Sequence, residues 1–231
     1  MFSRIALYLP FLVAVLASNY ENKQVQLNLG VIVDSFMWQG FVEKYKDEQT
    51  AEKEVRKYVE SLVELCNGWA KKTVPRPVFK LVDVTIWKQQ RDVYATNKKG
   101  RLQLQLRKLK TVLMNEAPNN GRYHVRHALT PRGVYAGVAG MAYGGGACSN
   151  WAYSAGFGAV KGVDVAKTRI SHANTMTHEL GHQIGIGHKS EGVSCYTPKN
   201  GAWAKAECGR AFQRLLAKRG SRCPAPEDIH N

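Results

Sequence analysis

Acidic residues and long apolar runs are scarce in this chain. Its 231 residues include 18 Asp and Glu against 33 Lys and Arg, a formal net charge of +15. The apolar run of residues 5–17 is about 13 residues long, too short to span a bilayer comfortably, and no later segment resembles a spanning helix. Internal repeats, low-complexity tracts and linkers are also absent. These absences exclude a repeat architecture and favour one domain of ordinary size.

Residues 1–18 are arranged like a cleavable secretory signal. Arg4 precedes the apolar run, and small residues follow near its end. We therefore predict a secreted, extracellular protein whose mature domain is residues 19–231. An uncleaved anchor or a buried first helix is the alternative.

Export permits disulfides, but an odd number of cysteines leaves one thiol unpaired. We expect two bridges in the C-terminal part of the chain and a free, buried Cys66, with intermolecular pairing through Cys66 as the alternative. The five cysteines are Cys66, Cys148, Cys195, Cys208 and Cys223.

The excess of basic residues can attract anionic glycans, cell surfaces or acidic substrates. The basic clusters are scattered, however, without interleaved aromatics or a recognisable nucleic-acid-binding module, so we expect no nucleic-acid partner. A solvated basic surface is the interpretation that the pattern favours. We expect a monomer.

Hydrophobic periodicity predicts a mixture of strands and helices. Strands are expected at residues 25–33 and 78–87, and an extended edge strand at 135–143. Helices are expected at residues 51–69, 102–114 and 209–218 and around the motif described next.

The most informative segment is His-Glu-Leu-Gly-His-Gln-Ile-Gly-Ile-Gly-His at residues 178–188. On a helix, His178 and His182 lie one turn apart on one face and can direct two imidazoles at one metal ion. Gly185 can adopt the left-handed conformation that ends the helix and brings back His188 as a third ligand. Three protein ligands with an open position are typical of catalytic zinc. We therefore predict one Zn²⁺ bound through the three Nε2 atoms.

Glu179 lies beside these ligands without being needed as one. Zinc activates water and polarises a carbonyl, and a neighbouring carboxylate can accept the proton of that water and deliver it to the leaving amine. A helix with incidental histidines or a structural metal is the alternative. The remaining histidines lack such spacing, and we expect them to be surface or capping residues: His124, His127, His172 and His230.

With this motif the chain resembles the metzincin metalloproteases, and among them the reprolysin (adamalysin) group of snake-venom, ADAM and arthropod salivary or venom enzymes. The likeness extends over residues 25–223. Residues 29–34 and 82–87 resemble the first two strands of the family, and residues 137–148 resemble its edge strand and following cysteine. The resemblance implies an α/β (α+β) fold with a twisted, mostly parallel sheet, an antiparallel edge strand, an active-site helix and a small irregular C-terminal subdomain.

The resemblance also implies a substrate clamp and a disulfide pattern. Substrate would lie antiparallel to the edge strand, whose candidate binding residues are Gly137, Val138, Ala139, Gly140, Met141 and Ala142. An edge with small, uncharged residues and no proline suits that task. A central strand, paired on both sides, is the alternative. Cys148 would pair with Cys223, and Cys195 with Cys208.

Three features depart from the family pattern. The chain has no Met after Met176, so the methionine turn below the metal is missing and Thr197 or a neighbour stands there. Lys189 replaces the usual Asp after the third histidine. We also expect the domain to follow the signal segment directly, without an inhibitory propeptide. An active endopeptidase acting on extracellular or host proteins is the favoured interpretation. The alternative is a zinc-binding pseudoprotease that acts as a secreted binding protein or toxin.

Overall fold

The computed structural model describes residues 23–116, 121–134, 139–150, 152–157, 165–190, 193–194 and 206–228. The predicted signal segment, Gly137, Val138 and Cys195 lie outside these ranges, as does His230. Among the residues described, no helix has the length and apolar character needed to cross a membrane.

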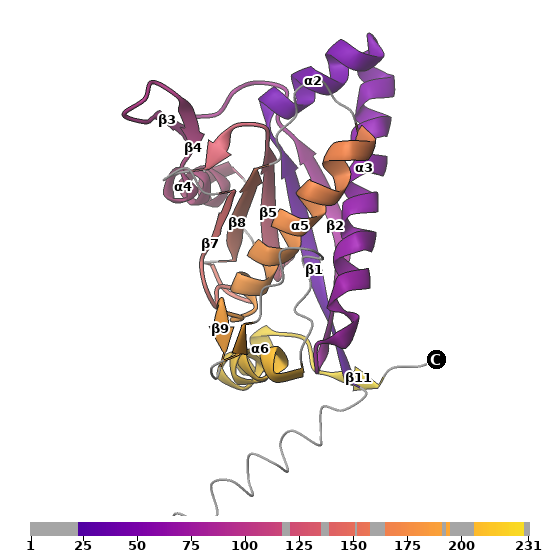
Figure 1. Cartoon of the computed structure of the whole chain (residues 1–231), viewed down its shortest axis with the longest axis vertical. Coiled ribbons are helices and arrows are strands. Elements are labelled where there is room, and N and C mark those ends of the chain that lie inside the picture. The colour runs from indigo at the N-terminus through magenta and orange to yellow at the C-terminus, as the bar shows by residue number, and fades with distance from the viewer. Residues whose placement is uncertain are drawn as a thin grey trace, which may run out of the picture.

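A mostly parallel sheet forms the centre of the molecule (Figure 1). Its strands follow the spatial order β2, β1, β5, β8, β7, with the short β11 added antiparallel to the start of β1. The first four of these strands are mutually parallel, whereas β7 runs antiparallel to β8 at the edge. The bounds are β1 Lys23–Val33, β2 Arg76–Ile86, β5 Val125–Thr130, β7 Gly140–Ala142, β8 Tyr153–Phe157 and β11 Glu227–Asp228. The predicted α/β architecture with an antiparallel edge strand is thereby confirmed.

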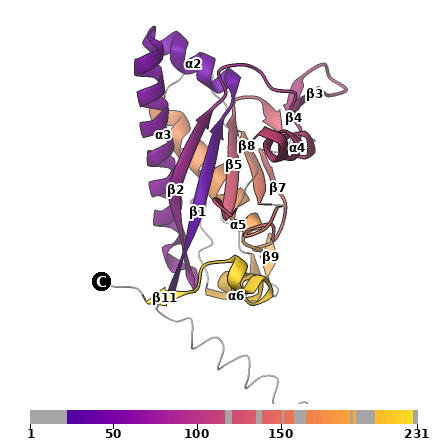
Figure 2. The same ribbon diagram turned by 180° about the vertical axis from the view of Figure 1, so that it is seen from behind.

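Helices cover the sheet unequally on its two faces. Helices α3 (Glu48–Trp69) and α5 (Val165–Gln183) pack against each other and lie across one face, with α2 (Ser35–Tyr45) at the end of the pair (Figure 1). Helix α4 (Leu106–Glu116) lies on the other face (Figure 2). Strand β1 contributes side chains to the cores on both faces of the sheet. Val31 and Val33 pack in the core below α3 and α5, whereas Ile32 packs in the core below α4.

The long helix α3 shows how sequence produces this packing. Its buried positions recur at helical spacing, and Val55, Val59 and Leu62 are fully buried. Asp47 caps the first turn by accepting a hydrogen bond from the backbone N–H of Thr50 at 2.7 Å. The helix therefore begins three residues before the predicted start at residue 51.

The prediction of a helix over residues 102–114 was wrong at its beginning. Residues Leu102–Leu104 form strand β4, which pairs with β3 (Tyr94–Thr96) and with β6 (Gly133–Val134). Helix α4 starts only at Leu106. The side chain of Leu104 is fully buried in the core below α4, so tertiary contacts outweigh the helical preference of leucine.

The C-terminal part forms a small subdomain below the sheet, where helix α6 (Ala206–Arg219) lies close to the two-stranded ladder of β9 (Lys189–Ser190) and β10 (Val193–Ser194) (Figure 1). Cys148 and Cys223 are bonded, with a Cα–Cα distance of 5.3 Å, in the pairing that the resemblance implies. Cys208 is also disulfide-bonded, but its implied partner Cys195 is outside the described ranges. Cys66 is free and buried, as predicted.

Candidate metal centre

The metal-binding motif occupies the end of α5 and the turn after it. Gly185 adopts φ +92°, as predicted, and the backbone N–H groups of Gly185 and Ile186 donate to the carbonyls of His182 and Gly181 at 3.0 and 2.9 Å. This pair of bonds is a Schellman motif, which ends the helix and reverses the chain. A side chain at position 185 would also lie 3.3 Å from the carbonyl oxygen of Ala211 in α6. The conformation therefore favours glycine here, and a side chain would in addition fit only tightly against α6.

The loop after β7 completes the end of this helix. The backbone N–H of Gly145 donates to the carbonyl of His182 at 2.8 Å, and that of Ala147 donates to the carbonyl of Gln183 at 2.9 Å. The carbonyl of His182 thus accepts a second hydrogen bond besides the one from Gly185, and the carbonyl of Gln183, at the end of the helix, gains the partner that the helix itself does not supply. Because Cys148 follows directly, its disulfide to Cys223 holds this loop to the C-terminal segment.

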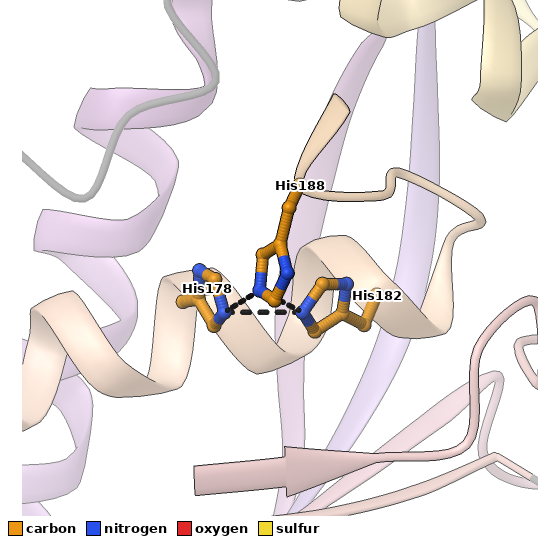
Figure 3. A group of neighbouring side chains, drawn as sticks. All are labelled: His178, His182 and His188. Carbon is orange, nitrogen blue, oxygen red and sulfur yellow. Dashed lines mark hydrogen bonds between the residues drawn. The ribbon is translucent and has the colours of Figure 1, made fainter. Parts of the chain in front are cut away.

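The three histidines converge as Figure 3 shows. The Nε2 atoms are separated by 3.0 Å (His178 to His182), 3.2 Å (His182 to His188) and 3.1 Å (His178 to His188). Nitrogens about 2.0–2.1 Å from a tetrahedral zinc ion lie about 3.3 Å apart, so the spacing is close to that of a three-histidine site. Among the described residues, these three form a group of side chains able to hold a metal ion.

The protonation of His182 suits a cation at the point of convergence. Its Nδ1 lies 2.8 Å from the carbonyl oxygen of Ile186, which can only accept a hydrogen bond. The ring proton of the neutral imidazole therefore sits on Nδ1, and the lone pair of Nε2 faces the other two histidines. A ring-nitrogen lone pair that faces two neighbouring imidazole nitrogens at 3.0 and 3.2 Å is an arrangement that a bound cation stabilises. The donor set thus fits a metal ion.

Burial favours the neutral, metal-binding form of these histidines. It lowers the pKa of His178 to about 4, with smaller contributions from neighbouring His182 and His188. The pKa of His182 is also lowered, again first by burial. Since a protonated imidazole cannot ligate a metal, the lowered pKa values keep both rings available at neutral pH.

Glu179 is close to the histidines but is not one of the converging groups. Its side chain is almost fully buried, and Oε1 lies 4.0 Å from Nε2 of His178. Oε2 has no hydrogen-bond partner within the described part of the chain. Burial raises the pKa of this carboxyl to about 8. A cation beside it would lower that pKa again, because an opposite charge stabilises the carboxylate.

Strand β7 and the three histidines border one cleft, which has a volume of about 450 Å³. Its lining residues come from β7 and the residue before it, from α5 and from the turn: Ala139, Gly140, Met141, Ala142, Thr175, His178, Glu179, His182 and His188. The structure therefore places four of the six predicted strand residues beside the histidines. Thr175 was missed, although its position one turn before Glu179 on the same helix could have identified it.

A buried polar cluster behind the metal centre was also missed. The amide of Gln183 donates to the hydroxyl of Ser154 at 2.5 Å and to the carbonyl of Arg126 at 2.9 Å. Nδ1 of His127 lies 2.7 Å from the same hydroxyl. The sequence signal for this cluster was Gln183 itself, a polar residue on the buried face of α5 directly after the predicted ligand His182.

The prediction that the remaining histidines are surface or capping residues was wrong for His127 and His172. Both are buried, and His172 Nδ1 lies 2.5 Å from the hydroxyl of Tyr58. Strand β5 is covered on both faces, so even its polar side chains point into packed layers. His124 is half-buried and accepts a hydrogen bond from the backbone N–H of Asn28 at 2.8 Å. Thr197, the predicted substitute in the methionine turn, lies outside the described residues.

Three converging histidines on a helix and a tight turn, beside an antiparallel edge strand, define a metallopeptidase-like site. Residues 56–189 match a family model described as "Metallo-peptidase family M12B Reprolysin-like". This match covers more than half of the chain, so the chain belongs to the reprolysin-like metallopeptidases of family M12B.

Structural comparison agrees on the fold. The chain is similar to a solved structure entitled "Structure of a chaperone-substrate complex", with a TM-score of 0.54 and 13% sequence identity. The similarity covers 87% of this chain and 35% of that chain, so this chain spans about a third of the solved one. At this identity the likeness concerns the fold alone. A comparison with curated protein sequences found no match.

Proposed function

We propose that this protein is a secreted zinc-dependent endopeptidase that hydrolyses peptide bonds of extracellular or host proteins. One observation carries the proposal: three histidine Nε2 atoms converge within 3.0–3.2 Å of each other, beside the buried carboxyl group of Glu179. Membership of a metallopeptidase family supports it further. His178, His182 and His188 would hold the zinc ion.

Zinc in such a site supplies Lewis acidity, which polarises a peptide carbonyl and makes water acidic enough to react near neutral pH. In this chain, Glu179 is the group positioned to accept the proton of the attacking water and to deliver it to the leaving amine. Its place in the lining of the cleft, beside the three histidines, supports this role.

Strand β7 is the proposed clamp for the substrate backbone. Residues Gly140–Ala142 pair only with β8 among the described strands, so their other edge is free to pair with an extended peptide. Backbone pairing tolerates many sequences, as an endopeptidase requires. In a series of peptides with single prolines, cleavage should fall where the missing N–H would have bonded to β7.

Cleavage of a quenched fluorescent peptide library, with and without a chelator, tests the proposal. We expect activity that the chelator abolishes and zinc restores. Glu179→Gln should keep its zinc and lose about 10²–10⁴-fold in turnover, because the amide preserves the shape of the side chain but cannot accept a proton. Exposed Glu60 in α3, changed to Gln, is the matched control and should leave turnover unchanged.

The same experiment separates the alternative function. A pseudoprotease would bind zinc with the same stoichiometry and cleave no peptide, and its Glu179→Gln variant would be indistinguishable from the parent. Zinc loss in Glu179→Gln would instead mean that the carboxylate is a ligand.

Secretion is supported by the Cys148–Cys223 disulfide, since such bonds persist in oxidising compartments. Expression in a eukaryotic secretory host tests it. The protein should accumulate in the medium with its N-terminus near residue 19, and retention in the cells with residues 1–18 attached would contradict it.

An anionic partner, such as a sulfated glycan, is proposed for helix α6. Arg210, Arg214 and Lys218 are exposed and follow each other at four-residue intervals, so they share one face of the helix. Replacing Arg214 and Lys218 with Gln should reduce retention on a heparin column and the salt dependence of binding. The control is the double variant Lys53→Gln, Lys98→Gln, which removes the same two charges at exposed positions elsewhere. Equal losses in both would indicate a diffuse charge effect.

A further inference from the structure

Gly140 lies at the first position of β7, directly against the side chain of Glu179. A Cβ atom added to Gly140 would lie 2.5 Å from Oε1, 2.7 Å from Cγ and 2.8 Å from Cδ of Glu179. Atoms of two residues do not approach this closely without one of them moving. The space that a side chain would occupy at position 140 is therefore filled by the carboxyl end of Glu179.

Backbone conformation gives no reason for glycine at this position. Gly140 lies outside the left-handed region that Gly185 and four other glycines of the described chain adopt. It pairs in regular antiparallel register with Gly156 of β8. Any residue could adopt this conformation, so the requirement is one of space alone.

Little else fixes the carboxyl group of Glu179. Its side chain is 3% exposed, Oε2 has no hydrogen-bond partner within the described residues, and His178 Nε2 is 4.0 Å from Oε1. Close packing against the backbone of β7 is therefore a contact that restricts where this carboxyl group lies.

We propose that Gly140 is a positioning residue for Glu179: its missing side chain provides the space that sets the distance between the proton-accepting carboxylate and the edge strand. One glycine thus places the base relative to both the histidines and a peptide paired with β7. The catalytic consequence rests on the proposed endopeptidase activity, whereas the packing between the two residues does not.

The proposal predicts that Gly140→Ala reduces turnover far more than it reduces stability or zinc binding. The three nearest atoms that the new methyl group meets all belong to the side chain of Glu179 and none to backbone, so movement of that side chain can relieve the clash. We therefore expect Tm to fall by only a few degrees and one equivalent of zinc to remain bound. Turnover should fall at least tenfold, mainly in kcat, because the carboxylate no longer reaches the attacking water.

Gly144→Ala is the matched control, four residues later in the same segment. Gly144 is exposed, its φ is not in the left-handed region, and an added Cβ would have no neighbour within 4 Å. Its kcat, KM, zinc content and Tm should equal those of the parent. An unchanged kcat in Gly140→Ala would overturn the proposal. So would a change in KM alone, because it would mean that the substitution has moved the strand and not the carboxylate.

A double-variant cycle of Tm values tests the packing between Gly140 and Glu179 and needs no activity measurement. Its result therefore distinguishes this proposal from the proposed function. The three clashing atoms all lie beyond Cβ of Glu179, so Glu179→Ala removes them. Gly140→Ala should lower Tm in the parent and leave Tm unchanged in the Glu179→Ala background. The same decrease in both backgrounds would contradict the proposal even if the parent protein is an active peptidase. The expected coupling in an inactive parent would support the packing and refute the peptidase.

Discussion

The side-chain amide of Gln183 donates a hydrogen bond of 2.5 Å to the hydroxyl of Ser154, which joins the end of the metal-binding helix to strand β8. A second bond of 2.9 Å reaches the carbonyl of Arg126 in β5. Both residues of the pair are fully buried. Because His182 directly precedes Gln183, these bonds hold the turn of α5 that carries the second histidine against the sheet.

Gln183→Leu should lower the free energy of unfolding by about 1–3 kcal/mol, the cost of leaving a buried partner without its hydrogen bond. Urea unfolding of the metal-free protein measures this loss. Glu60→Leu, at an exposed position of α3, should change the free energy of unfolding much less. Equal stability of the Gln183→Leu protein and the parent would show that the two bonds contribute nothing net.

Zinc should stabilise the folded protein, because the three histidines converge only in the native state. A ligand at a thousand times its Kd adds about 4.1 kcal/mol, so calorimetry should record a clear rise of Tm when zinc replaces chelator. His188→Ala should abolish most of that rise. Since the side chain of His188 is exposed, the metal-free variant should unfold at the temperature of the metal-free parent. An undiminished rise in the variant would exclude His188 as a ligand.

The Cys148–Cys223 disulfide joins residues 75 positions apart, and the chain-entropy model assigns about 3–5 kcal/mol to closing a loop of this order. The double variant Cys148→Ser, Cys223→Ser should be less stable by that order in denaturant unfolding. Zinc affinity should fall as well, because the loop beside Cys148 binds the last carbonyls of α5. Unchanged zinc affinity would show that the hydrogen bonds hold the loop without the disulfide.

The metal centre could be read from the sequence because it is local: residues 178–188 contain every converging histidine, and helical geometry with one left-handed glycine determines their approach. Strand β1 and helix α3 could be predicted for a similar reason, since each has a clear hydrophobic period. Strand β4 could not, because Leu102–Leu104 become extended only by pairing with β3 and β6.

The contacts that support the metal centre could not be predicted from the sequence, because they join residues that are far apart along the chain. Gly140 and Glu179 are separated by 39 positions, and only the fold shows that one fills the space beside the other. His127 was expected to be a surface or capping residue, because it lacks the spacing of a metal ligand. The sequence does not show that the hydroxyl of Ser154 will lie 2.7 Å from its Nδ1 within the buried sheet.

The burial of His127 should make the protein sensitive to acid. Burial, followed by the nearby His172, lowers the pKa of His127 from the ordinary 6.5 to about 3. Between these two pH values the unfolded chain binds a proton at this site and the folded chain does not, so stability decreases as pH falls through the window. The slope is at most about 1.4 kcal/mol per pH unit for one group. Urea unfolding of the metal-free protein at several pH values between 7 and 4 measures this slope.

The side chain at position 127 cannot titrate in the variant His127→Gln. The stability of this variant should therefore fall less steeply with acid than that of the parent, while carboxylates and the metal-site histidines contribute equally to both. Parallel stability curves for the two proteins would show that His127 is protonated in the folded state as readily as in the unfolded chain.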